Sequence, residues 1–192
     1  MISLISRHFG LFFLLISLAG LSSGCAAASA GSASAPRAEL ESYEDPEHPG
    51  WLLVSSDLGG FRALMPSTPR RARESGSGTQ LWSHRIGAVY LVSFHDDDFF
   101  RKHGGRVRGA LETFRGRRTY GAAAVLASTD ESLDGNPGAQ ALYRTKDGKT
   151  VAYRAYVSGT RVYELIVSSS AGESFPEEDA RLFFSSVHLR SP

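Results

Sequence analysis

Cysteine is almost absent from this sequence, which has a single one, Cys25, among its 192 residues. An intramolecular disulfide is therefore excluded, and the folded part of the chain must be held together by its core, for which 42% hydrophobic residues supply the material. Net charge is lacking too, because 21 Lys and Arg stand against 20 Asp and Glu. Such a chain has no basic field of the kind that attracts nucleic acid, so we expect no nucleic-acid partner.

Motifs that carry catalytic chemistry are also missing. The serine-rich stretch 168–174 lacks a Gly-x-Ser-x-Gly elbow, and the sequence has no His-Glu-x-x-His pair and no glycine-rich phosphate loop. The one thiol lies in a segment that suggests acylation or removal rather than catalysis. These absences favour a non-catalytic protein without a cofactor, and they leave enzyme activity open.

Long hydrophobic runs are missing as well. The longest apolar stretch, residues 9–21, is shorter than the ~20 residues that a helix needs to span a bilayer. It follows Arg7 at the extreme N-terminus and precedes a series of small residues, which is the pattern of a secretory signal. The sequence therefore predicts an exported protein.

Two processing sites compete after this run. Residues 22–25 resemble the bacterial lipobox, in which the cysteine is acylated and becomes the first mature residue; Gly24 and Cys25 fit it, whereas Ser22 stands where leucine is usual. The alternative is cleavage after residues 28–30 (Ala-Ser-Ala), which would release a secreted protein beginning at Gly31. We expect Cys25 to be the lipid anchor, with the lipoprotein facing the periplasm or the cell surface.

The rest of the chain divides into a linker and one domain. Residues 26–36 contain only Ala, Ser, Gly and Pro, and residues 37–50 are acidic and punctuated by proline. The first stretch predicts a flexible leash, and the second a further linker or a loosely packed arm. We therefore expect a signal peptide at 1–25, a linker at 26–50 and a single α+β domain at 51–192.

Strand signals dominate the domain. Apolar or alternating runs bounded by turn residues predict strands, and the charged, glycine-rich stretch 70–78 predicts a loop. Gly87 and an Asp-Gly turn at 147–148 predict two hairpins. The strand at 161–170 is largely apolar on both faces, which indicates a central strand. The other expected strands lie at 51–56, 59–69, 79–86, 88–94, 122–129, 139–145 and 150–157.

Two stretches change to a helical period. In 105–118 the apolar residues fall at i, i+3, i+4 and i+7 and form one stripe. In 176–187 a proline and three acidic residues suit the start of a helix, and paired phenylalanines at 183–184 lie on its inward face. The sequence thus predicts two helices, the second followed by a short last strand at 188–189.

Three local patterns resemble an exported bacterial group. They are Phe61 followed by Pro66 and Pro69, a Gly-Asn-Pro-Gly turn at 135–138, and the terminal Phe-Phe pair. The group is similar to the PsbP-like fold, and the resemblance covers residues 51–190. It implies an antiparallel sheet of about six to eight strands covered by two main helices. Members of that superfamily serve as accessory or binding proteins, including a photosystem II extrinsic subunit and a Ran-binding import factor, and none of their site residues can be placed on this chain.

A histidine- and aspartate-rich stretch is the candidate metal site. His95, Asp97, Asp98 and His103 carry imidazole and carboxylate groups that could ligate a divalent metal. Their spacing matches no closed zinc or EF-hand pattern. The alternative is a strand that leads into a helix, with the acidic run at the positive end of the helix dipole.

Two further sets of side chains are candidates for binding. Basic residues in and before the first helix could contact anionic lipid headgroups or a partner, or could form a solvated helix face. Tyrosines on neighbouring strands could line a pocket, or could be cross-strand packing pairs. The basic set is Arg106, Arg108, Arg115, Arg117 and Arg118, and the tyrosine set is Tyr143, Tyr153, Tyr156 and Tyr163.

The expected function follows from the predicted location and the missing motifs. We expect a non-catalytic envelope lipoprotein that acts as an accessory or interaction module, held at the membrane by its anchor and partnered by another envelope protein. The alternative is a carrier or sensor of small ligands with a pocket between sheet and helix. A third possibility is a metal-dependent enzyme that uses the cluster at 95–98.

Overall fold

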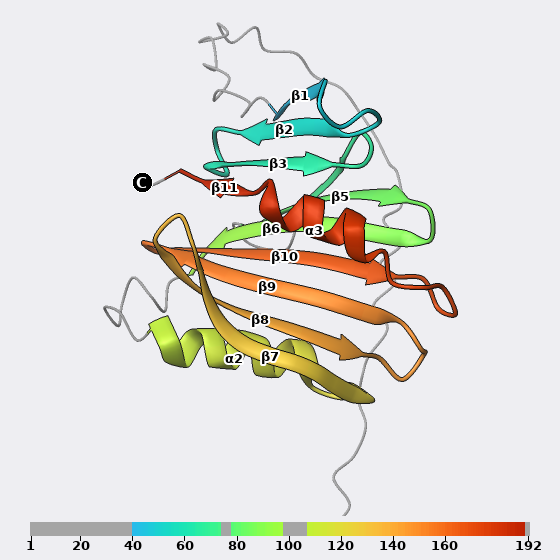
Figure 1. The fold of residues 1–192 in the computed structure, drawn as a ribbon. Coiled ribbons are helices and arrows are strands. Elements are labelled where there is room, and N and C mark those ends of the chain that lie inside the picture. The colour runs from blue at the N-terminus through green and yellow to red at the C-terminus, as the bar shows by residue number, and fades with distance from the viewer. Residues whose placement is uncertain (1–39, 74–77, 98–106, 191–192) are drawn as a thin grey trace, which may run out of the picture. The chain divides into compact units, whose positions relative to one another are not determined.

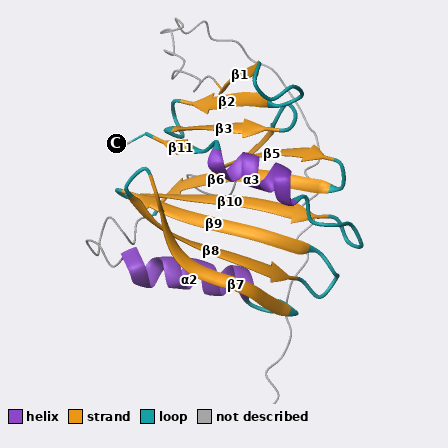
Figure 2. Ribbon diagram, in the orientation of Figure 1, coloured by secondary structure: helices purple, strands orange, loops and turns teal. Residues whose placement is uncertain are grey.

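The computed structural model describes residues 40–73, 78–97 and 107–190. Within these ranges the chain forms two antiparallel sheets and two helices (Figure 1, Figure 2). Four of the candidate residues lie outside the described ranges, so their roles stay predictions: Cys25, Asp98, His103 and Arg106.

The smaller sheet has four strands in the order β1–β2–β3–β11, and the larger has seven in the order β4–β5–β6–β10–β9–β8–β7. The strands of the smaller sheet are β1 Leu40–Glu44, β2 Leu52–Ser56, β3 Phe61–Met65 and β11 His188–Leu189. Those of the larger sheet are β4 Arg70–Arg73, β5 Thr79–Arg85, β6 Ala88–Asp96, β7 Ala124–Leu133, β8 Asn136–Arg144, β9 Thr150–Ser158 and β10 Arg161–Ser169. The helices are α2 Val107–Thr119 and α3 Glu177–Ser185.

Several expectations from the sequence are confirmed. Gly87 and Gly148 have positive φ angles in the tight turns that join β5 to β6 and β8 to β9, a backbone shape that glycine adopts without steric cost. The strand β10 is central, between β6 and β9. Both helices lie within two residues of their predicted bounds, and neither they nor any other helix in the described ranges is long and apolar enough to cross a membrane.

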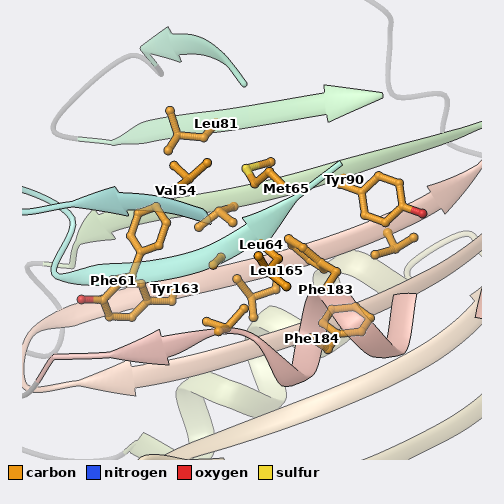
Figure 3. Packing of buried hydrophobic residues seen from close by; sticks show 14 of the residues in the cluster. Val54, Phe61, Leu64, Met65, Leu81, Tyr90, Tyr163, Leu165, Phe183 and Phe184 are labelled. Atoms are coloured by element: carbon orange, nitrogen blue, oxygen red, sulfur yellow. The ribbon is translucent and has the colours of Figure 1, made fainter. Parts of the chain in front are cut away.

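The larger core joins the two sheets and α3. Phe61, Leu64 and Met65 of β3 are buried against Tyr90 of β6 and Leu165 of β10, and α3 adds its phenylalanine pair (Figure 3). The alternation of strand side chains explains this arrangement, because every second residue of β6 and β10 faces the same side.

The smaller core lies on the opposite face of the seven-stranded sheet, under α2. Ala110 and Leu111 of the helix pack against strands β8 and β9, where Ala141, Tyr153 and Ala155 are buried. The helical period seen in the sequence therefore identified the buried face of α2 correctly.

Three expectations need correction. The one predicted sheet is two sheets, since β2 pairs with β3, β3 pairs with β11, and these strands face the larger sheet through the common core. The predicted loop at 70–78 begins with β4, an edge strand. The predicted linker contains β1, which pairs with β2 from Leu40 to Glu44 and is almost entirely exposed, as expected of a loosely packed arm. Exposed edge strands bury too little apolar surface to show in a hydrophobic pattern.

The β7–β8 hairpin reaches from the larger sheet to the smaller one. At its tip, the Asp134 carboxylate accepts a hydrogen bond at 2.8 Å from the backbone N–H of Leu189 in β11. The strong curl of the hairpin is visible in Figure 1. This contact ties the tip of the hairpin to the smaller sheet.

Candidate functional site

The four candidate tyrosines lie on two faces of the seven-stranded sheet. Tyr143 and Tyr153 pack into the core under α2, whereas Tyr156 and Tyr163 pack into the larger core. All four are buried, and Tyr156 lies directly across from Tyr163 in the β9–β10 register. The four tyrosines therefore do not line one pocket. Tyr156 and Tyr163 form a cross-strand packing pair, which is the alternative to a pocket that the sequence left open.

A buried ion pair joins the last turn of α2 to the middle of the sheet. Glu164 lies in β10, and its side chain is 10% exposed. The Arg118 guanidinium donates hydrogen bonds from Nε and Nη2 to the two carboxylate oxygens, at 3.0 and 2.7 Å. The Tyr153 hydroxyl donates a third, at 2.9 Å. Because bidentate contact is a strong geometry for arginine and carboxylate, this pair fixes α2 on the sheet.

The ionisation of this cluster follows from the same contacts. Burial raises the pKa of the Glu164 carboxyl, but the hydrogen bonds and charge of Arg118, with smaller effects from Tyr153 and His95, outweigh burial and hold that pKa below its ordinary value. Burial, together with the charge of Glu164, raises the pKa of the Tyr153 phenol. An ionised carboxylate and a protonated phenol are not poised for proton transfer at neutral pH, so the cluster supports the fold rather than acid–base chemistry.

The candidate metal ligands are only partly described. His95 is in β6 with its ring centroid 6.3 Å from that of Phe114 in α2, and its buried Nδ1 has no hydrogen-bond partner among the described residues. The neighbouring Asp96 is bound instead to Arg161, at 2.9 and 3.2 Å. Within the described ranges no group of three His, Cys, Asp or Glu side chains could hold a metal. The metal site at 95–103 therefore stays a prediction.

The candidate arginines are divided by their ion pairs. Arg118 is turned toward the buried carboxylate, and Arg115 and Arg108 lie 3.1 and 3.7 Å from Asp130 in β7. Arg117 is exposed and forms no ion pair with the described part of the chain. The basic helix thus does not present one continuous cationic face.

A groove of 340 Å³ lies between the seven-stranded sheet and α3. Its walls come from β7, β8, β9, α3 and the segment before α3, and its floor is apolar, with Leu142, Ala152 and Phe184. Polar groups line the sheet side, where the Gln140 amide donates a hydrogen bond at 2.8 Å to the Thr129 hydroxyl. An apolar floor with a few polar groups is typical of a small-molecule site.

Two guanidinium groups belong to the groove. Arg154 lies over the Phe184 ring, 4.4 Å from its centroid, and 3.6 Å from Glu131. Arg181 of α3 is exposed and has no ion pair with the residues that the structure describes. The groove therefore combines an apolar floor with one paired cation, one unpaired cation and the carboxylate of Glu177, which also lines it.

A second hollow of 340 Å³ lies at the start of β10, and its charges neutralise one another. Arg161 is bound in bidentate fashion by Asp96, and Arg190 pairs with Asp57 at 2.6 Å. Because its cations are already paired, it is a weaker candidate than the groove beside α3.

The sequence did not identify Glu164, and it predicted a pocket between sheet and helix without the residues that line the groove, Tyr153 excepted. Glu164 was one polar position in an apolar strand, and its partner lies 46 residues away along the chain. A single charge in a strand that is apolar on both faces was the available signal. The groove had no local signal, because Thr129, Leu142 and Arg181 come from three separate elements.

Comparisons with known proteins found similarity of structure only. No protein-family model matches the sequence, and no curated protein matches it. A similar solved structure is cyanobacterial PsbP from Synechocystis sp. PCC 6803, with 14% identity, coverage of 84% of this chain and 98% of that chain, and a TM-score of 0.47. Another is the Ran-binding protein Mog1p of Saccharomyces cerevisiae, with 8% identity, coverage of 80% and 97%, and a TM-score of 0.43.

The fold is similar to that of PsbP in the arrangement of its elements, and it is richer in β structure than one sheet covered by two helices. At these TM-scores and identities the similarity concerns the arrangement of elements alone.

Proposed function

We propose that this protein is a non-catalytic binding module of the cell envelope, tethered by a lipid at Cys25, that holds a small ligand in the groove between the sheet and α3. The groove carries the proposal, because its 340 Å³ volume reaches the lower range of small-molecule sites. Among the functions expected from the sequence, this is the carrier or sensor.

The lining of the groove limits the class of ligand. Leu142, Ala152 and Phe184 favour an apolar or aromatic body, which gains from leaving water. Arg181 has no carboxylate partner in the described chain and would pair with an anionic group. The ligand is therefore a small amphipathic molecule with an apolar body and one acidic group.

A blocking substitution tests this function. Thr129 is exposed in β7 and lines the groove, so Thr129→Trp should fill part of it without removing a core residue. The matched control is Ser128→Trp, because Ser128 is the adjacent exposed residue, faces the opposite side of the sheet and does not line the groove. The probe is anilinonaphthalene sulfonate, which has an aromatic body and one anionic group, and its fluorescence is measured by titration into the folded protein.

We expect the native chain and the Ser128→Trp variant to bind the probe at one site, and the Thr129→Trp variant to lose most of that affinity. Arg181→Glu should weaken the binding at least about tenfold, since it places a like charge beside the sulfonate. Equal binding to both tryptophan variants would show that the probe does not occupy the groove and would contradict the proposal.

A further inference from the structure

One corner of the domain combines exposed apolar side chains with basic ones. It consists of the last turn of α2, the start of β7, the end of β8 and the β8–β9 turn, which gather at one end of the seven-stranded sheet (Figure 1). The register confirms the proximity, since Ala124 pairs with Arg144 and the backbone N–H of Ala123 donates to the Arg144 carbonyl at 2.8 Å. We call residues 117–126 and 144–149 the α2–β7 corner.

The apolar part of the corner is strongly exposed. Tyr120 is 91% exposed, Val125 53% and Leu126 50%. The described chain has six large exposed hydrophobic residues, and these three lie in this one stretch. Residues 119–129 contain no charged side chain. Exposed aromatic and aliphatic side chains that cluster in this way mark a contact surface.

Basic side chains surround the apolar residues. Arg117, Arg144 and Lys146 are exposed, and no ion pair with the described residues involves them. The fourth cation, Lys149, pairs with Asp147 at 2.7 Å. With Arg118 neutralised by its buried partner, the corner has four cations against one anion, a net charge of +3 on a protein whose formal net charge is +1.

We propose that the α2–β7 corner docks on an anionic lipid bilayer, with Arg117, Arg144 and Lys146 against the headgroups and the Tyr120 ring at the interface. Lysine and arginine are attracted to anionic headgroups, and tyrosine favours the boundary between headgroups and acyl chains. The surface that touches lipid is therefore the end of α2, rather than the whole basic face of the helix.

Two other occupants fit the corner less well. A second copy would bring two corners of charge +3 together, which like-charge repulsion opposes. An added peptide strand needs a regular ladder along β7, but a bulge between Val125 and Ala127 interrupts it at the exposed apolar residues. The lipid surface needs neither opposite protein charge nor a regular edge. This inference is independent of the groove, which lies beyond the bulge.

Hydrogen exchange of the full chain tests the docking. The chain is reconstituted in vesicles of phosphatidylglycerol and phosphatidylcholine, and in vesicles of phosphatidylcholine alone, so that its apolar N-terminal run is common to both. Arg117→Glu with Arg144→Glu removes the charge of the corner. The matched control is Arg62→Glu with Arg71→Glu, because these arginines are exposed on β3 and β4 and the change in net charge is the same.

We expect phosphatidylglycerol to slow the exchange of the amides at 120–126 at least about fivefold relative to phosphatidylcholine, and about 0.5 M salt to remove the difference. The corner variant should lose the slowing, the control variant should keep it, and Tyr120→Ser should keep only part of it. Equal exchange on the two lipids, or equal loss in both double variants, would overturn the proposal. Slowing that needs an added envelope protein and ignores the lipid would assign the corner to a protein partner instead.

Discussion

Glu164 is the one carboxylate among the buried residues of the described chain. Its two oxygens accept three hydrogen bonds from Arg118 and Tyr153, so the cost of removing it from water is offset by direct partners. The pair thus explains both why a charge is tolerated in the central strand and why the end of α2 is held in place.

Removal of the guanidinium should be costly because it leaves the carboxylate buried and unpaired. We expect Arg118→Ala to lower the free energy of unfolding by about 3 kcal/mol, the low end for a broken buried pair, since Arg118 itself is partly exposed. Urea unfolding at pH 7 measures the loss. The control is Arg117→Ala, on the exposed side of the same turn, which should change stability by less than about 0.5 kcal/mol.

Acid gives a second readout of the same pair. The pKa of Glu164 is lowered in the folded state, so its stabilisation is complete above its ordinary value of 4.5 and is lost as the pH falls through the lower, folded value. In the Glu164→Gln variant, the free energy of unfolding should therefore fall less steeply with decreasing pH below 4.5 than it does in the native chain. An unchanged slope in that variant would mean that other carboxylates account for the acid sensitivity.

The β7–β8 hairpin depends on a glycine that lets an aromatic ring lie flat on the strand. A Cβ atom at Gly138 would meet the Tyr156 ring and would lie 2.7 Å from the Ala155 carbonyl oxygen. The Tyr156 hydroxyl donates a hydrogen bond at 2.7 Å to Glu131 of β7, which crosses the hairpin. Gly138, Tyr156 and Glu131 therefore hold β7 to the sheet where no further strand supports it.

Alanine at two glycines should have opposite effects. Gly138→Ala should destabilise the protein by about 1–3 kcal/mol, because the added methyl group displaces Tyr156 or the strand beneath it. Gly109→Ala in α2 should stabilise it by about 0.5–1 kcal/mol, since its Cβ would meet open space and alanine is the better helix former. Thermal unfolding of the two variants beside the native chain gives the comparison, and a stabilised Gly138→Ala would show that the ring contact is not tight.

The common core predicts that the two sheets unfold together. Trp51 lies beside the smaller sheet, packed edge-on to Tyr90 at 5.8 Å, and Trp82 lies in β5 of the larger sheet. Trp82→Phe leaves Trp51 as reporter, and Trp51→Phe leaves Trp82. In each variant we expect the urea midpoint from tryptophan fluorescence to equal the midpoint from far-UV circular dichroism, as in two-state unfolding. A separate, earlier transition of Trp51 would show that the smaller sheet is an independent unit.

Local chemistry in the sequence was enough to predict the hairpins, the helices and the central strand. Gly87, the Asp-Gly turn and the apolar stripe of α2 act over a few residues, so their effects can be read from the pattern. The division into two sheets could not be predicted, because alternation shows which residues of β3 are buried but not which strand lies beside them. For the same reason, the partner of Glu164 and the walls of the groove emerged only with the tertiary structure.

The place of β11 has a consequence for the order of events in folding. This strand pairs with β3, so His188 lies opposite Arg62. The last described strand therefore joins the sheet that the first three strands form. Such a pairing has a long sequence separation and forms late. During synthesis the sheet stays unfinished until residues 188–189 have left the ribosome. For a chain expected to be exported, that delay would keep the polypeptide in a form that can still be threaded through a narrow channel.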